Sequence, residues 1–161
     1  MPVKIKKAKL VSLIVARLTA NFATLEKAAR TSHAEATHES SKAENKYDTR
    51  GLEAAYLAGG QARQAREILA AIKDFETLQL RDFTDTDPVD LGAFVELEAD
   101  GVASTYFLGP KSGGLEIEKP EFMVITPQSP LGQNIVGRKQ GDRWAAELGG
   151  TKAKYHLKSV I

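Results

Sequence analysis

The sequence predicts an α+β protein, in which an N-terminal antiparallel α-helical hairpin precedes a small antiparallel β-sheet that carries one short helix. Three observations favour this fold class. Residues 7–38 contain no proline or glycine, and their apolar residues recur at steps of three and four. The second half contains short apolar runs separated by Asp-Gly and Gly-Gly pairs, which are typical of β-hairpins. A Ser-Pro pair at 129–130 indicates the start of a short helix.

Composition limits the classes of function. The chain has 161 residues, of which 42% are hydrophobic, and a formal net charge of +1. It contains no cysteine, which excludes disulfides and cysteine zinc sites and favours a cytoplasmic location. The near-neutral charge argues against bulk attraction to nucleic acid. No apolar run approaches the length of a membrane span, so we expect no membrane partner. We also expect the protein to be a monomer.

Two helices are expected in the first half. In the first, the apolar positions form a heptad seam at Val11, Ile14, Leu18, Asn21, Leu25 and Ala28. A second run begins near residue 45 and follows the same steps through Ala54, Leu57, Gln61, Gln64, Ile68, Ala71, Phe75 and Leu78. The Ser40-Ser41 pair is the expected point of reversal. The sequence therefore predicts a coiled-coil hairpin over residues 1–82, with its tip near residues 39–48.

A second domain is expected over residues 83–161. The stretch at 85–88, Asp-Thr-Asp-Pro, is a turn signal that separates it from the helices. Five strand-like runs follow, at 93–98, 102–108, 121–126, 143–147 and 153–160. The pairs Asp100-Gly101 and Gly149-Gly150 mark tight turns between neighbouring strands.

The stretch from residue 129 to residue 142 has a local structure that can be predicted. Ser129 is a good N-cap, and Pro130 suits the first position of a helix. Leu131 and Ile135 lie four residues apart, so they share one face of that helix. Gly137 suits the C′ position that ends it.

The same stretch resembles the NSPIGRALLGKKVGD signature of the bacterial Gre transcript-cleavage factors. Further matches occur at Val89-x-Leu91-Gly92, at residues 106–110 (Tyr-Phe-Leu-Gly-Pro) and at residues 124–132 (Val-Ile-Thr-Pro-Gln-Ser-Pro-Leu-Gly). A shorter match is Glu44-Asn45-x-Tyr47 in the first half. The resemblance implies an N-terminal coiled-coil hairpin, followed by a C-terminal domain that is similar in fold to the FK506-binding proteins.

The resemblance also implies a function. In the Gre family the Ser-Pro loop docks on RNA polymerase, which assigns partner binding to Ser129, Pro130 and Leu131. The hairpin enters the secondary channel of the polymerase, where tip acids help to hold Mg²⁺ beside the 3′ end of backtracked nascent RNA. The protein is then not an enzyme by itself, and it binds no cofactor stably. It shares Mg²⁺ with the polymerase active site, which catalyses the cleavage.

The tip acids of this chain are carried over from the family pattern Asp-x-x-Glu-Asn-x-Glu-Tyr. Glu44 occupies the position of the second acid and is the expected transient Mg²⁺ ligand. Ser41 stands where the first aspartate is expected, and Glu39 is near enough to replace the missing carboxylate. By spacing alone, these acids are typical of an ordinary solvated helix face.

The tip leaves two alternatives open. If Glu44 acts as a Mg²⁺ ligand at the tip, the chain promotes transcript cleavage. Since Ser41 brings no charge, the chain is alternatively a Gre-like regulator that occupies the same channel without cleavage. A third hypothesis, a peptidyl-prolyl isomerase or chaperone, follows only from the expected fold of the second half, and a prolyl-peptide turnover assay tests it.

A basic segment begins the chain. Lys4, Lys6, Lys7 and Lys9 recur within the first nine residues. Such a run is most often a solvated end, and this is the interpretation that we adopt for it. The alternative is contact with RNA or with an acidic surface of the polymerase.

Overall fold

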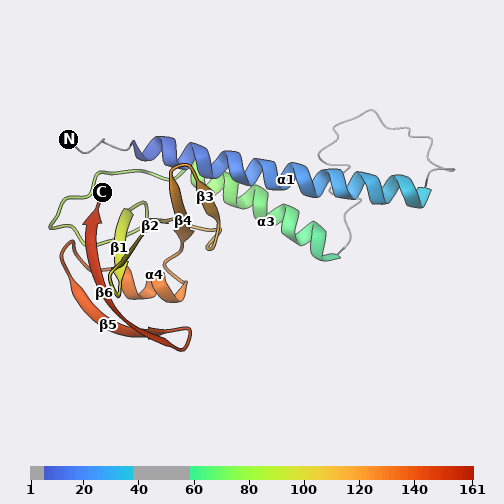
Figure 1. Cartoon of the computed structure of the whole chain (residues 1–161). Helices are drawn as coiled ribbons and strands as arrows, with labels where there is room; N and C mark the ends of the chain where they lie inside the picture. Colours follow the sequence, from blue (N-terminus) through green and yellow to red (C-terminus); the bar gives the residue numbers. More distant parts are fainter. Residues whose placement is uncertain (1–5, 38–58) are drawn as a thin grey trace. The chain divides into compact units, whose positions relative to one another are not determined.

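The structure is a computed structural model, and it describes residues 6–37 and 59–161 (Figure 1). It contains two compact units. One combines the chain up to Ile14 with residues Asp74–Ile161, and the other covers Val15–Lys73. The α+β class is confirmed, because helices occupy the first half and a six-stranded sheet with one short helix occupies the second. The tip predicted near residues 39–48 lies outside the described residues.

The first helix, α1, covers Lys7–Thr37, close to the predicted range. Its predicted seam is partly wrong. Ile14 and Leu18 are buried as expected, but Asn21 is exposed and the neighbouring Phe22 is buried instead. Ala29 is buried in the same way in place of Ala28. A straight helix has 3.6 residues per turn, whereas a heptad seam assumes 3.5. The buried face of a straight helix therefore moves to later residues than the heptad pattern predicts, here from Asn21 to Phe22.

The described part of the second helix, α3, covers Gly59–Glu76. Gln61 and Gln64, which the heptad pattern placed in the seam, are exposed, whereas Ala65 is buried. Ala65 forms a small core with Phe22 and Ala29 of α1. The two helices therefore pack against each other in this unit, with alanine at the contact on both sides.

One stretch of α1 also has the composition of a membrane span. Lys7–Arg30 has a mean hydropathy of 1.3, and it is the one such segment among residues 6–37 and 59–161. The expectation that no run approaches that length is therefore wrong by length and composition. A core helix passes the same test, and 28% of the apolar stretch is buried inside the protein.

The sheet has the strand order β3-β4-β2-β1-β6-β5 (Figure 1). Its strands are β1 Phe94–Ala99, β2 Val102–Leu108, β3 Glu116–Glu118, β4 Glu121–Ile125, β5 Arg143–Leu148 and β6 Thr151–Val160. The five predicted strands are confirmed, with small differences at their ends, while β3 was not predicted. The expectation of a wholly antiparallel sheet is wrong at one place, because β2 and β4 are parallel. Between them the chain reverses direction twice, once before β3 and once in the β3–β4 hairpin.

The main core lies between one face of the sheet and the short helix α4, Pro130–Ile135. Ile135 is fully buried among strand residues that include Val95, Leu97 and Leu157. Leu131, one turn earlier, packs against the same core and stays half-buried. The predicted shared face of Leu131 and Ile135 is therefore confirmed, and it fixes α4 against the sheet.

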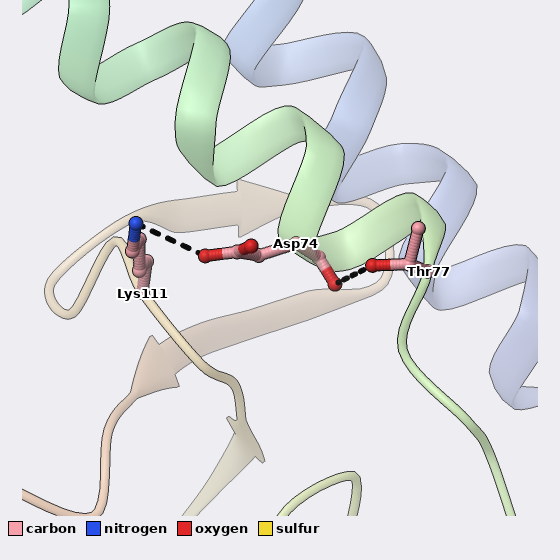
Figure 2. A network of polar contacts seen from close by, with 3 residues as sticks. All are labelled: Asp74, Thr77 and Lys111. Carbon is pink, nitrogen blue, oxygen red and sulfur yellow. Dashed lines mark hydrogen bonds and ion pairs between the residues drawn. The ribbon is translucent and has the colours of Figure 1, made fainter.

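The end of α3 is held by the loop that follows β2. The Phe75 ring lies 6.3 Å from the Phe107 ring of β2, measured between centroids. A Cβ atom on Gly109 would stand 2.7 Å from Phe75 Cζ, so glycine allows the ring to lie on the backbone there. The Asp74 carboxylate forms a 3.0 Å ion pair with Lys111 Nζ, and the Thr77 hydroxyl donates to the Asp74 carbonyl oxygen (Figure 2).

The interpretation of the basic start as a solvated end is wrong for Lys7. Its side chain is buried, and Nζ donates to the carbonyl oxygens of Arg81, Gly92 (3.0 Å) and Ile161 (3.2 Å). Nζ also lies 4.6 Å from the centroid of the Phe83 ring. Burial lowers the pKa of Lys7, and the nearby Asp82 carboxylate opposes this effect. Lys7 thus ties the first turn of α1 to three separate segments of the same compact unit.

Candidate functional site

The loop that precedes α4 is fixed by a small network around Ser129. Its hydroxyl donates to the Thr126 carbonyl oxygen (2.7 Å) and accepts from the Gly132 N–H (3.1 Å). The Ser129 N–H in turn reaches the Thr126 carbonyl oxygen and hydroxyl. Ser129 is extended, and Pro130 follows in the first turn of the helix, so the predicted cap is confirmed. The serine of the Ser-Pro-Leu motif therefore has a structural role in holding the loop.

Gly132 is required by a close approach of two backbone segments. A Cβ atom at this position would stand 1.7 Å from the Thr126 carbonyl oxygen. No side chain fits at that distance, and the clash is with backbone rather than with a flexible side chain. Gly132 therefore allows α4 to begin directly on the end of β4.

The far end of α4 is tied to the segment that precedes β1. Gly137 has a φ of +88°, the left-handed conformation predicted for a C′ glycine. Its N–H donates to the Val89 carbonyl oxygen (2.9 Å), and the Val89 N–H donates to the Arg138 carbonyl oxygen (2.8 Å). These two bonds explain structurally why Val89 and Gly137 both occur in the motifs of this chain.

The Gly141-Asp142 pair forms the turn that leads into β5. The Asp142 carboxylate accepts from the Lys139 N–H (2.9 Å), and Gly141 has a φ of +95°. The Gly141 N–H donates to the Leu157 carbonyl oxygen of β6 (2.8 Å). The glycines and the aspartate of the motif thus build the loop, and surface binding is left to the other side chains.

An apolar surface remains where α4 begins. Pro130 is exposed, and Leu131 is half-buried at the edge of the core. Val136, just after the helix, is 39% exposed. An exposed proline beside a part-exposed leucine on a rigid turn is a suitable anchor for a protein partner.

Ser129, Pro130 and Leu131 also line a groove of about 440 Å³ on the α4 side of the sheet. Its other walls come from five strands and one turn: Leu97, Ala99, Val102, Ser104, Tyr106, Gly114, Met123, Ile125, Leu148 and Tyr155. Val102, beside the β1–β2 turn, is 68% exposed. The groove is thus mostly apolar, with two tyrosines in its wall, and it opens next to the predicted docking residues.

Sequence reasoning missed most of this groove. Tyr106 and Tyr155 lie on alternating strand positions, which indicated only core packing. The detectable signal was Val102, an apolar residue directly after the Asp-Gly turn, at a position where a polar side chain is common.

A cation is held close to the groove. The Arg138 guanidinium lies 3.9 Å from the centroid of the Trp144 ring, and its Nε donates to the Asn134 carbonyl oxygen (2.6 Å). Trp144 stacks in turn on Tyr155, with 5.5 Å between ring centroids. Since Tyr155 lines the groove, Arg138 places a fixed positive charge near an apolar surface, where an acidic group of a partner is favoured.

The tip acids Glu39 and Glu44 lie outside the described residues, as does Ser41. Their assignment therefore stays a prediction from the sequence. Within the described ranges 6–37 and 59–161, no cluster of three or more His, Asp or Glu side chains is suited to hold a metal ion.

No protein-family model matches the chain, and no curated protein matches it. Three solved structures show what it is similar to. The GreA factor homolog 1 (Gfh1) protein of Thermus thermophilus is 22% identical over 91% of this chain and 94% of its own, with a TM-score of 0.39. Gfh1 of Thermus aquaticus is 22% identical, over 90% and 92%, with a TM-score of 0.40. A GreA/GreB elongation factor from Nitrosomonas europaea is 14% identical, over 70% and 88%, with a TM-score of 0.34. These structures come from the family that the sequence motifs resemble.

Proposed function

We propose that this chain is a Gre-type transcription elongation factor that docks on bacterial RNA polymerase. Docking uses the Ser129–Leu131 loop together with the groove beside it. The helical hairpin then enters the secondary channel, and the polymerase itself cleaves backtracked RNA. The chain is not an enzyme on its own, and it acts in the cytoplasm with one copy bound to each polymerase.

One observation carries this proposal. Pro130 and Leu131 lie at the mouth of an apolar groove, on a turn whose geometry is fixed by Ser129 and Gly132. A rigid apolar anchor beside a groove favours a protein partner, because little conformational entropy is lost on binding. The sequence motif that resembles the Gre signature is the same segment, so the two observations support one surface.

The docking surface gives the first prediction. We expect Pro130→Ala combined with Leu131→Asp to weaken binding to RNA polymerase at least about tenfold, since a buried charge replaces a central apolar contact. Binding is measured by titrating labelled protein with core polymerase. Leu131→Met is the matched control, because it keeps an apolar side chain of similar size, and it should bind nearly as the wild type does. Unchanged binding of the double variant would remove the docking assignment.

The tip gives the second prediction. Glu44 would lend a carboxylate to Mg²⁺ that the polymerase active site holds, where the metal stabilises charge during phosphoryl transfer. We expect Glu44→Ala to reduce the stimulated release of 3′ RNA fragments to the background rate without a change in polymerase affinity. Glu39→Ala is the companion variant. If Glu44→Ala still cleaves and Glu39→Ala does not, the metal-binding role belongs to Glu39.

Ser41 supports the second candidate, a regulator that occupies the channel without promoting cleavage. A hydroxyl in place of a carboxylate lowers the negative charge that is available to a shared Mg²⁺ ion. Polymerase binding by the wild-type chain with no acceleration of cleavage would favour this candidate over the first.

A further inference from the structure

Strand β5 forms one edge of the sheet, and its pairing with β6 shows which backbone groups point outward. Leu157 of β6 faces β5, because it donates to the Asp142 carbonyl oxygen (2.9 Å) and accepts from the Gly141 N–H. Lys154 faces β1 instead, because its N–H and carbonyl oxygen both bond Asp100. Groups alternate along an antiparallel strand, so Tyr155 faces its β5 partner Trp144.

The same alternation continues along β5. Trp144, Ala146 and Leu148 direct their N–H and carbonyl groups towards β6. The backbone groups of Arg143, Ala145 and Glu147 therefore point away from the sheet, along an edge where no further strand of the described residues pairs. β5 contains no proline, so all of its outward-pointing N–H groups can donate. An edge strand with unpaired N–H and carbonyl groups pairs readily with another strand.

The side chains of this edge are self-complementary. Arg143 and Glu147 are both exposed, lie on one face of the strand and carry opposite charges, with the small Ala145 midway between them. In an antiparallel pair of two β5 strands with Ala145 opposite Ala145, each Arg143 stands opposite a Glu147. Opposite charges directly across a strand pair are stabilising.

We propose that β5 pairs with β5 of a second copy of this chain, antiparallel and in this register. The three outward-pointing residues then face one another, so each facing pair can exchange N–H and carbonyl hydrogen bonds. Trp144 stands opposite the small Ala146 on the other face of the sheet. Lys152 of β6, the cross-strand neighbour of Glu147, adds a second cation beside that carboxylate.

Other registers lose these contacts. A slip of one residue places the outward-pointing backbone groups of one strand opposite residues of the other strand whose backbone groups already bond β6. A slip of two residues places Arg143 opposite Ala145, so the ion pair is lost. A parallel pairing in register places like charges side by side, which is unfavourable. The β5 edge therefore favours pairing with a second copy in one register. We expect the free protein to form a concentration-dependent dimer rather than to stay a monomer.

Sedimentation velocity on the full chain over a wide concentration range tests this proposal without the polymerase. We expect reversible dimers that weaken at high salt, because the ion pairs are exposed. Glu147→Arg alone and Arg143→Glu alone should each raise the dissociation constant roughly tenfold or more. The double swap, Arg143→Glu with Glu147→Arg, should recover most of the lost affinity, because each new charge again meets its opposite across the interface. Recovery stays short of the wild-type dissociation constant, because Lys152 then lies opposite an arginine.

Hydrogen exchange provides an independent readout. The amides of Arg143, Ala145 and Glu147 should become protected as the concentration rises, while those of Trp144 and Ala146 are already protected by β6. A chain that stays monomeric at every concentration would overturn the proposal. So would single reversals that leave dimerisation unchanged, or a double swap that fails to restore it while the fold is intact by circular dichroism.

Discussion

The Gly132→Ala substitution is expected to lower the free energy of unfolding by about 3 kcal/mol or more and to abolish polymerase docking. Its Cβ would stand 1.7 Å from the Thr126 carbonyl oxygen, so α4 has to move away from the end of β4. That movement breaks the Ser129 cap and displaces Pro130 and Leu131. Urea unfolding followed by the fluorescence of Trp144, the single tryptophan, measures the loss of stability.

Gly137→Ala is the matched control for this effect. Gly137 has a positive φ, but no heavy atom lies within 4 Å of a Cβ placed there. Its replacement should therefore cost only the strain of the left-handed conformation, about 1–2 kcal/mol. A Gly132→Ala variant that is no less stable than Gly137→Ala would show that the contact with Thr126 does not constrain the loop.

The Lys7→Met substitution is expected to lower the free energy of unfolding by about 2–3 kcal/mol. Methionine fills the apolar path of the lysine stem, but it leaves the buried Gly92 carbonyl oxygen and the partly buried Arg81 carbonyl oxygen without their lysine donor. Lys9→Met is the control, because Lys9 is exposed and belongs to the same basic run. Equal stability of the two variants would contradict the role assigned to Lys7.

The pH dependence provides a second test of Lys7. Burial lowers its pKa in the folded protein below the ordinary value of 10.5. Between the lowered pKa and 10.5, the unfolded chain binds more protons at this site than the folded chain does. The contribution of Lys7 to the free energy of unfolding therefore rises with pH across this window. Lys7→Met should lose that rise, whereas Lys9→Met should keep it.

Local chemistry made much of the second half predictable. The Ser129 cap, the first-turn Pro130 and the C′ Gly137 each follow from the conformation that the residue prefers, and all three are found. The strands on either side of Asp100-Gly101 could be predicted equally well, because their apolar runs end at a strong turn signal. Strand β3 was missed because it has three residues, two of them glutamates, and gives no apolar run.

Tertiary contacts decided what the sequence could not show. Lys7 looked like part of a solvated run, yet three distant carbonyl groups bind its ammonium group. Glycine is needed at position 132 because the Thr126 carbonyl oxygen, six residues earlier, lies against it. No local sequence pattern predicts that contact. In α1 a heptad and a straight-helix pattern share Ile14 and Leu18, and only packing distinguished Phe22 from Asn21.

The candidate site was predictable to a similar extent. Pro130 and Leu131 were found from their motif, but the groove beside them requires the sheet to bring together residues as distant as Leu97 and Tyr155. The tip acids Glu39 and Glu44 rest on the sequence alone, so their roles are separated only by the variants proposed above.

The most direct test uses a stalled, backtracked elongation complex with labelled RNA and the purified full-length chain. Co-migration with the polymerase and release of short 3′ RNA fragments are followed in the same samples. We expect the wild-type chain to co-migrate and to accelerate release, and the Pro130→Ala, Leu131→Asp variant to do neither. A wild-type chain that does not co-migrate, or a variant that co-migrates equally well, would contradict docking through this loop.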